Sequence, residues 1–480
     1  MKKYKIYNSI LLLTLFIVNI GCNDLLDESP DERLEVNSLE KVSATLIGAY
    51  QNDRGFRFTH WSTDNVTLTQ NVFDNAPIIE DLYGWSRNFR NQTHQDSPSS
   101  FWVTTYSSIA NVNLALESLD KLTINSNMQA QADAIKGEAL IMRSYCHFML
   151  VNIFAKHYDQ TTASSDLGIP YVTKVEDELM VDYERGTVED VYNKAEKDLL
   201  EGIALLEKDS KEVNKNKYRF TYPSVYLYAS RFFNYRNRDD ADVEQTLAYA
   251  TKAINAFGGV DVMRPWSEYG SDEYGPIDVD QQEVGMVQTS ATWLMYNWTY
   301  HMTTGIRDDE LANNPFGKSD TRLNRSWNKA GDIFIPTSFF IFRQGKSGNS
   351  ATDIFPLAEA IFNSAESSIR KGDFEKATEM LNIIGGKVYE SYDPTNLTTE
   401  NLKAFYKLED TKQAWTEYLL FERRNMFLMR GFRWFDIKRY GLDVEHTLED
   451  GTKVKLSDVA PNKDFQIPID AINSGMQANK

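Results

Sequence analysis

Six charged residues at helical spacing near the carboxyl end could suggest catalysis: Glu422, Arg423, Arg424, Arg433, Asp436 and Arg439. Opposite charges three or four residues apart on a helix more often pair with one another, and such pairs commonly form structural networks. The chain contains no His-Glu-x-x-His or Cys-x-x-Cys spacing, and no phosphate-binding or dinucleotide-binding glycine pattern. We therefore predict that these six charges form structural ion pairs.

Two stretches that interrupt the helical pattern carry residue types suited to binding sugars. Residues 51–98 and 258–350 combine Asn, Asp, Ser, Thr, Gln and Gly with many Trp, Tyr and Phe. Flat rings can cover the apolar C–H patches of a sugar, while amide and carboxylate side chains pair with its hydroxyls. Seven rings are the candidate ligand contacts: Trp61, Tyr83, Trp85, Trp266, Trp293, Tyr296 and Trp298. Core packing is the alternative for each ring, and we expect at least two to be exposed.

Acidic residues of the second stretch could instead bind calcium: Asp261, Asp272, Glu273, Asp278 and Asp280. Clustered loop oxygens suit this ion, but the spacing is not that of an EF-hand. A solvated acidic loop is the simpler interpretation. Six scattered histidines indicate no zinc site either, so we predict no cofactor.

The amino terminus has the pattern of a secretory signal. Three lysines within the first five residues precede an apolar run over residues 10–18, and Gly21 and Cys22 follow. A basic region, a short apolar region and a small residue before the cleavage point are typical of such signals. The apolar run is shorter than the ~20 residues that a membrane-spanning helix needs.

Cys22 in this position resembles the lipidated cysteine of a bacterial lipoprotein, although Asn19 stands where such sites usually have leucine. We predict that residues 1–21 are removed, that Cys22 carries acyl chains such as palmitate, and that residues 22–34 form an acidic tether. A cleaved signal with an incidental cysteine and a single buried thiol are the alternatives.

Composition predicts a large folded core. The 480 residues are 42% hydrophobic and 12% aromatic, which argues against global disorder. The net charge of −18 becomes three units more negative without the signal, which argues against binding nucleic acid or an anionic membrane surface. Only two cysteines exist, so lipidation of Cys22 would leave Cys146 without a disulfide partner.

Hydrophobic periodicity predicts a mostly all-α fold. Apolar residues spaced alternately by three and four predict a buried helix over residues 135–153, with Cys146 as a small buried side chain. Further helices are predicted over 38–50, from 100 onward, and over 188–206, 224–235, 244–256 and 374–388. Small residues in paired helices and a Gly-Asp turn indicate tetratricopeptide-like hairpins. We expect a single large globular unit with long aromatic-rich loops and a few short strands.

The segment from Trp415 to Tyr440 resembles the carboxyl-terminal signature of the SusD/RagB family of outer-membrane nutrient-binding lipoproteins. The matching positions are Glu422, Arg423, Arg424, Gly431, Arg433, Trp434, Phe435, Asp436 and Arg439. Met426, Arg430 and Tyr440 depart from the family pattern. Weaker matches follow in order along the chain, including residues 102–113, 136–145, 358–360 and 465–470.

This resemblance implies a helical fold of tetratricopeptide-like hairpins topped by irregular loops. It divides the chain into an N-terminal SusD-like region with ligand-facing loops, residues 35–300, and a C-terminal SusD/RagB region, residues 301–480. It also implies a non-enzymatic surface lipoprotein of the outer membrane that captures an oligosaccharide or a peptide. The implied partner is a TonB-dependent transporter of the SusC/RagA type. A surface glycan hydrolase with two acidic residues, or an adhesin without a transporter, are the alternatives.

Overall fold

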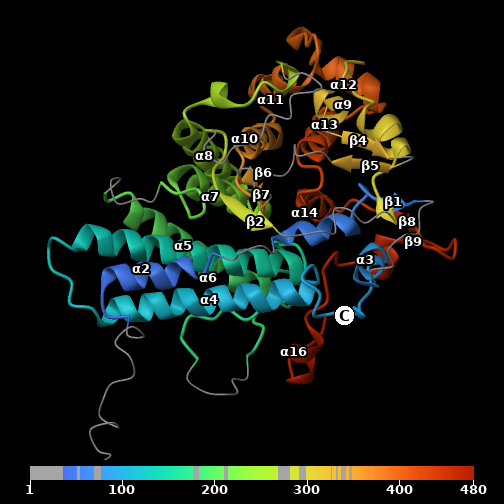
Figure 1. The fold of residues 1–480 in the computed structure, drawn as a ribbon. Helices are drawn as coiled ribbons and strands as arrows, with labels where there is room; N and C mark the ends of the chain where they lie inside the picture. The colour runs from blue at the N-terminus through green and yellow to red at the C-terminus, as the bar shows by residue number, and fades with distance from the viewer. Residues whose placement is uncertain are drawn as a thin grey trace, which may run out of the picture.

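Stacked pairs of helices make up most of the computed structural model (Figure 1). This confirms the predicted mostly all-α fold class. The residues that the structure describes are 36–50, 55–69, 77–176, 183–209, 215–268, 282–290, 299–325, 327–330, 333–336, 342–344 and 349–479. The predicted signal, Cys22 and the tether therefore lie outside the described residues.

Four helices from the amino-terminal part lie side by side (Figure 1): α2 (Leu39–Ile47), α4 (Pro98–Lys121), α5 (Gln129–Phe154) and α6 (Val188–Leu206). The Ser38 side chain accepts a hydrogen bond from the Lys41 amide, which begins α2 where the sequence predicts it. Helices α5 and α6 are in close contact at two glycines, since a Cβ added to Gly137 would lie 2.8 Å from the Gly202 carbonyl oxygen. Small residues at this crossing thus let α5 and α6 pack tightly.

The helices of the second layer continue the stack: α7 (Tyr222–Arg236), α8 (Asp240–Phe257), α10 (Leu357–Lys371), α11 (Phe374–Val388), α12 (Thr399–Tyr406), α13 (Thr411–Met426) and α14 (Phe432–Arg439). Gly372 ends α10 with a φ of +76°, and the Asp373 side chain then caps α11 by accepting from the Lys376 amide. This is the Gly-Asp turn that the sequence predicts between paired helices.

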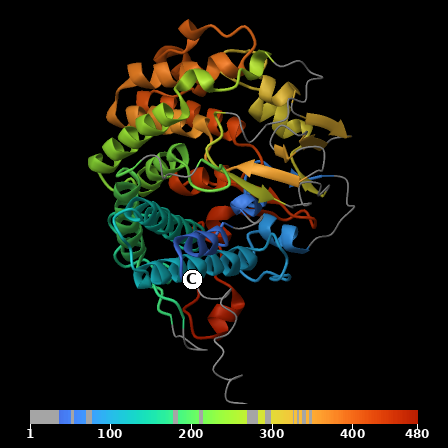
Figure 2. The same ribbon diagram turned by 60° about the vertical axis from the view of Figure 1, so that its left-hand side comes forward.

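Most of the strands lie on one side of the stacked helices (Figure 2). Strand β2 (Val287–Ser290) pairs with β7 (Asn349–Asp353), which pairs with β6 (Phe342–Gln344), all antiparallel. The two-stranded pairs are β1 (Thr67–Leu68) with β3 (Tyr300–His301), β4 (Trp327–Ala330) with β5 (Ile333–Pro336), and β8 (Glu445–Thr447) with β9 (Lys453–Lys455). In β2, Gln288 stands opposite Thr352 of β7.

Short helical segments connect these elements: η1 (Phe56–Ser62), α3 (Pro77–Tyr83), η2 (Val260–Val262), η3 (Trp266–Glu268), η5 (Ile306–Leu311), α9 (Thr321–Arg325), η8 (Pro394–Asn396), α15 (Leu456–Val459) and α16 (Ile469–Asn473). One continuous core of buried apolar side chains extends from Leu39 to Ile467. Both predicted regions, 35–300 and 301–480, contribute to this core. Within the described ranges, no helix is both long and apolar enough to span a bilayer.

Candidate functional site

Four of the seven predicted ligand-binding rings are buried in the core. Trp61, Tyr83, Trp85 and Trp266 are each at most 6% exposed, so none offers a face to a ligand in this structure. These four rings pack in the core, which is the alternative to ligand binding given for each of them above. The other three, Trp293, Tyr296 and Trp298, lie outside the described residues and remain a prediction. Of the acidic calcium candidates, only Asp261 lies within the described part of the chain.

A buried histidine explains why the rings of Tyr83 and Trp85 are covered. The ring of His446, in β8, stacks between Tyr83 and Trp85, with centroids 3.9 Å and 4.3 Å away and interplanar angles of 4° and 10°. Its Nδ1 lies 2.7 Å from the Tyr83 carbonyl oxygen, and its Nε2 lies 3.1 Å from that of Thr63. Burial lowers the pKa of His446, although both carbonyl contacts act in the opposite direction. The β8–β9 hairpin thus seals this loop region.

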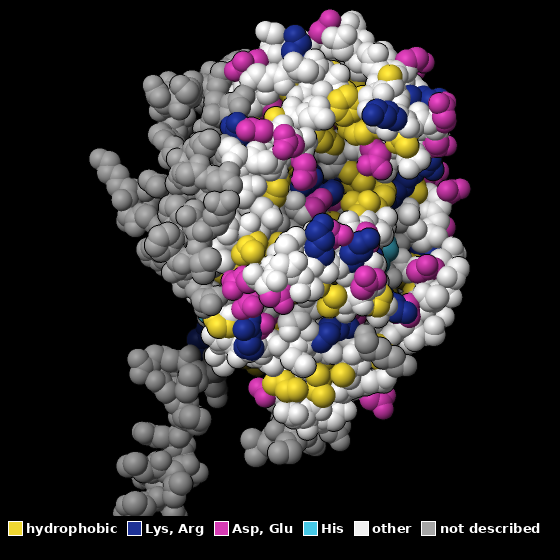
Figure 3. Space-filling model, turned by 90° about the vertical axis from the view of Figure 1, so that its right-hand side faces the viewer, with side chains coloured by type: hydrophobic (Ala, Val, Ile, Leu, Met, Phe, Trp, Pro, Cys, Tyr) yellow, Lys and Arg dark blue, Asp and Glu magenta, His cyan; other side chains and the backbone are white. Residues whose placement is uncertain are grey.

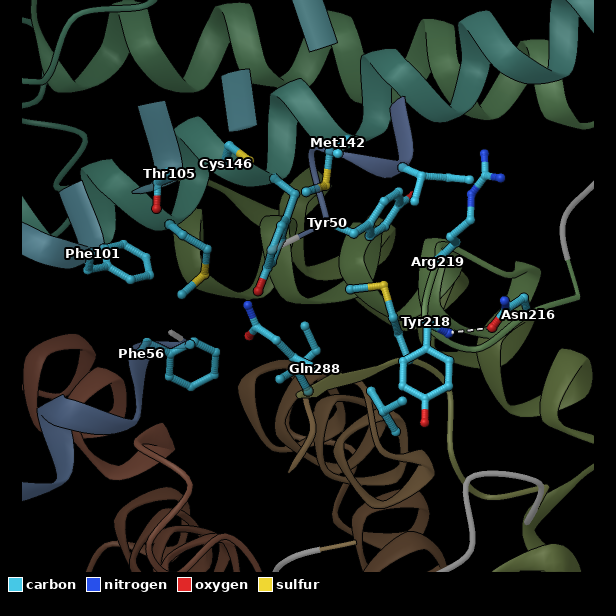
Figure 4. Close-up of a pocket in the computed structure, with 18 residues that line it drawn as sticks. Tyr50, Phe56, Phe101, Thr105, Met142, Cys146, Asn216, Tyr218, Arg219 and Gln288 are labelled. Carbon is cyan, nitrogen blue, oxygen red and sulfur yellow. Dashed lines mark hydrogen bonds between the residues drawn. The ribbon is translucent and has the colours of Figure 1, made fainter. Parts of the chain in front are cut away.

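A pocket of about 480 Å³ lies between the amino-terminal helices and β2 (Figure 4). Its volume falls within the range of about 300–1,000 Å³ that is usual for small-ligand sites. The wall comes from five separate elements: Ile47 from α2, Phe56 from η1, Phe101 from α4, Met142 from α5 and Gln288 from β2. Because the residues of this wall are spread along the chain from α2 to β2, local sequence patterns gave no signal for this site.

The two ends of this pocket differ in chemistry (Figure 4). Phe56, Phe101 and Cys146 line one end, and each is less than 7% exposed. Burial raises the pKa of the Cys146 thiol to about 12, so this cysteine acts as a small apolar side chain. Asn216 and Arg219 line the opposite end, where Asn216 is exposed and Arg219 is half-buried. The pocket is therefore apolar where it is closed and polar where it opens.

A buried carboxylate holds the polar end in place. Arg219 donates to both carboxylate oxygens of Glu138, over 2.9 Å from Nε and 2.7 Å from Nη2. The Tyr50 hydroxyl also donates to Glu138 and accepts from the Phe220 amide at 3.1 Å. Burial and the Glu138 charge raise the pKa of Tyr50 well above its ordinary value. Both side chains are therefore fixed before any ligand arrives.

Gln288 is the polar group best placed to meet a ligand. Its side chain lies between the two ends of the pocket (Figure 4) and makes no hydrogen bond within the described part of the chain. Gly55 makes room for it, because a Cβ on Gly55 would come within 2.7 Å of the Gln288 Oε1 atom. An amide carries both a donor and an acceptor, which suits a hydroxyl group of a ligand.

The signature residues lie in a buried ion-pair network outside the pocket. Arg423 donates to Asp436 at 3.1 Å, and Arg439 donates to Asp436 at 2.7 Å and to Glu366 at 2.7 Å. All of these side chains are 2% exposed or less. Glu366 also accepts hydrogen bonds from Tyr440 and Arg370, and its pKa lies far below the ordinary value because of these arginines. This network joins α10, α13 and α14.

Three further signature residues, Glu422, Arg424 and Arg433, pair with residues outside this network. Glu422 accepts from Arg322 at 2.9 Å and from the Tyr389 hydroxyl at 2.5 Å, and burial raises the Glu422 pKa. Arg424 donates to the Asp64 carbonyl oxygen, and Arg433 donates to the Asp64 carboxylate at 2.8 Å and 3.0 Å. Through Asp64, the carboxyl-terminal helices thus fix the segment that follows η1.

Stacked helical hairpins enclosing an amphipathic pocket define this molecule as a mainly helical protein of the tetratricopeptide-like kind. Residues 24–233 match a SusD-like family model described as starch-binding associating with outer membrane. This match to the amino-terminal part of the chain agrees with the resemblance of its carboxyl-terminal signature to the SusD/RagB family. No curated protein matches the sequence.

Solved structures share the fold over almost their whole length. A putative sugar binding protein from Bacteroides vulgatus is 22% identical, with a TM-score of 0.72 over 93% of this chain and 99% of the other. A SusD superfamily protein from Bacteroides thetaiotaomicron is 18% identical, with a TM-score of 0.69 over 92% and 100%. A SusD-like carbohydrate binding protein from Bacteroides vulgatus is 16% identical, with a TM-score of 0.68 over 91% and 96%.

Proposed function

We propose that this chain is a non-enzymatic, glycan-binding lipoprotein of the outer membrane. The observation that carries the proposal is the pocket of about 480 Å³, which combines aromatic walls with a Gln288 amide that bonds to no other described residue. The descriptions of its family and of its structural neighbours, starch-binding and sugar binding, support a carbohydrate as the ligand class. Acidic and basic side chains intersperse on the face shown in Figure 3, which is the mixed surface of a water-exposed protein.

Gln288→Ala is expected to weaken glycan binding about 5- to 30-fold. The variant removes one or two hydrogen bonds to ligand hydroxyls, which together contribute about 1–2 kcal/mol. Isothermal titration calorimetry against the best ligand from an oligosaccharide panel measures the change. Gln129→Ala, at an exposed position of α5, is the matched control and should bind as the wild type does. Equal affinity of both variants would show that the glycan does not bind in this pocket. Release of shorter sugars by the purified protein would favour a hydrolase.

Anchoring and partnership form the second part of the proposal. Cys22 carries the acyl chains, residues 22–34 form the tether, and the lipoprotein passes its ligand to a SusC/RagA-type TonB-dependent transporter from the outer surface. Mass spectrometry of the protein isolated from membranes should find an acylated Cys22, and a large transporter should co-purify with it. The Cys22→Ala variant should appear in the soluble fraction. Membrane retention of that variant would contradict the anchor, and isolation without a transporter would favour an adhesin.

A further inference from the structure

The closed end of the pocket is more apolar than a sugar ring requires. Cys146 and Met149 from α5 face this space together with Phe56 and Phe101, Met142 lies at its inner limit beside Tyr50 (Figure 4), and all five are buried. A hydroxyl group placed among such side chains loses its hydrogen bonds to water, at a cost of about 1–3 kcal/mol each. An unsubstituted sugar has hydroxyls around its whole ring, so it fits the polar end better than the closed end.

Thioethers and phenyl rings favour one kind of apolar group. Methionine sulfur makes favourable contacts with aromatic rings, and phenyl rings pair edge to face with another ring. Met286 and Ile354 also line the pocket, on the β2 side, and both are buried. The Thr105 hydroxyl also points into this end (Figure 4), where it can accept or donate one hydrogen bond. The closed end therefore suits an aromatic ring with a single polar substituent.

The open end suits the sugar part of the same ligand. Asn216, Tyr218 and Arg219 stand there at half-buried or exposed positions, and Gln288 lies between them and the closed end (Figure 4). Ile47, which is 51% exposed, also lines the pocket. A ligand entering from this side places its innermost group among the methionines and leaves its hydroxyls at the polar side chains.

We propose that the pocket selects glycans that carry an aryl substituent, with the aryl ring in the closed end and the sugar at the open end. This inference rests on the proposed glycan-binding function and specifies its ligand class. The proposal depends on one continuous pocket that has an apolar closed end and a polar open end.

Matched pairs of glycosides test the proposal. The 4-nitrophenyl and methyl glycosides of maltose, cellobiose and xylobiose are titrated into the full-length lipoprotein by calorimetry. The aryl member of at least one pair should bind at least ten-fold more tightly than its methyl partner. Thr105→Phe, which fills the closed end, should reduce that preference to less than two-fold because it takes the space of the aryl ring. Cys146→Leu, which adds fewer atoms at the same end, is made in parallel, and thermal unfolding confirms that each variant is folded.

Val103→Phe is the matched control, because Val103 lies on the same helix but is 62% exposed on its outer face. It should keep the full aryl preference. Equal binding of both members of every pair overturns the aryl proposal and leaves the proposed function intact, whereas absence of binding by every glycoside overturns both. A preference that persists in both filled variants, or tighter binding of the peptide Gly-Phe-Gly than of every aryl glycoside, also overturns the proposal.

Discussion

Glu359→Gln is expected to lower the free energy of unfolding by about 3–5 kcal/mol, because it leaves a buried arginine without its counter-charge. Glu359 in α10 accepts two hydrogen bonds of 2.6 Å from Arg231 in α7, and the two side chains are at most 1% exposed. The Arg231 guanidinium also lies 4.3 Å from the Phe355 ring centroid. No water can replace the lost carboxylate at such a site, so the full cost falls on the folded state.

Urea unfolding followed by circular dichroism measures this change. Glu375→Gln, at an exposed position of α11, should stay within about 0.5 kcal/mol of the wild type. The double variant Arg231→Met/Glu359→Met should recover most of the loss, because replacing both partners by apolar side chains removes the desolvation cost along with the attraction. If the double variant is as unstable as Glu359→Gln, the Arg231–Glu359 pair stabilises the fold by more than the mutual compensation of its two charges.

The sequence predicted the helical scaffold well because local patterns determine it. Helix α5 covers the predicted stripe of residues 135–153, the helix predicted from residue 38 begins there, and the predicted Gly-Asp turn separates α10 from α11. A helix buries its face through residues three and four apart, so a short window of sequence contains the information.

The site could not be predicted in the same way, because contacts between distant residues decide which rings are buried. Tyr83 and Trp85 stand in a polar, loop-rich stretch, and His446, more than 350 residues later, covers them. Nothing near either ring in the sequence indicates that partner. The pocket has the same origin, since Phe56, Met142 and Gln288 come from three separate elements that only the packed fold brings together.

Gly431→Ala is expected to lower the free energy of unfolding by about 2–5 kcal/mol and to weaken ligand binding as well. Gly431 has a φ of +84°, in the left-handed region where a Cβ costs about 1–2 kcal/mol. A Cβ there would also come within 2.5 Å of the Phe56 carbonyl oxygen and 2.8 Å of Thr59 Oγ1, and such overpacking costs about 1–3 kcal/mol. Thr59 donates to the Gly431 carbonyl oxygen, so the α13–α14 turn and η1 are directly joined.

Ligand binding should weaken because η1 carries Phe56, which lines the pocket. To relieve the contact, the Phe56 backbone must move away from Gly431, and the Phe56 ring forms part of the pocket wall. Gly451→Ala separates the two effects, because Gly451 has a φ of +82° with no atom within 4 Å of an added Cβ. That control should lose only the conformational cost of about 1–2 kcal/mol and bind ligand normally. Urea unfolding and calorimetry on both variants test this, and equal losses in the two would show that the signature glycine acts through its backbone conformation alone rather than by holding η1 against the pocket.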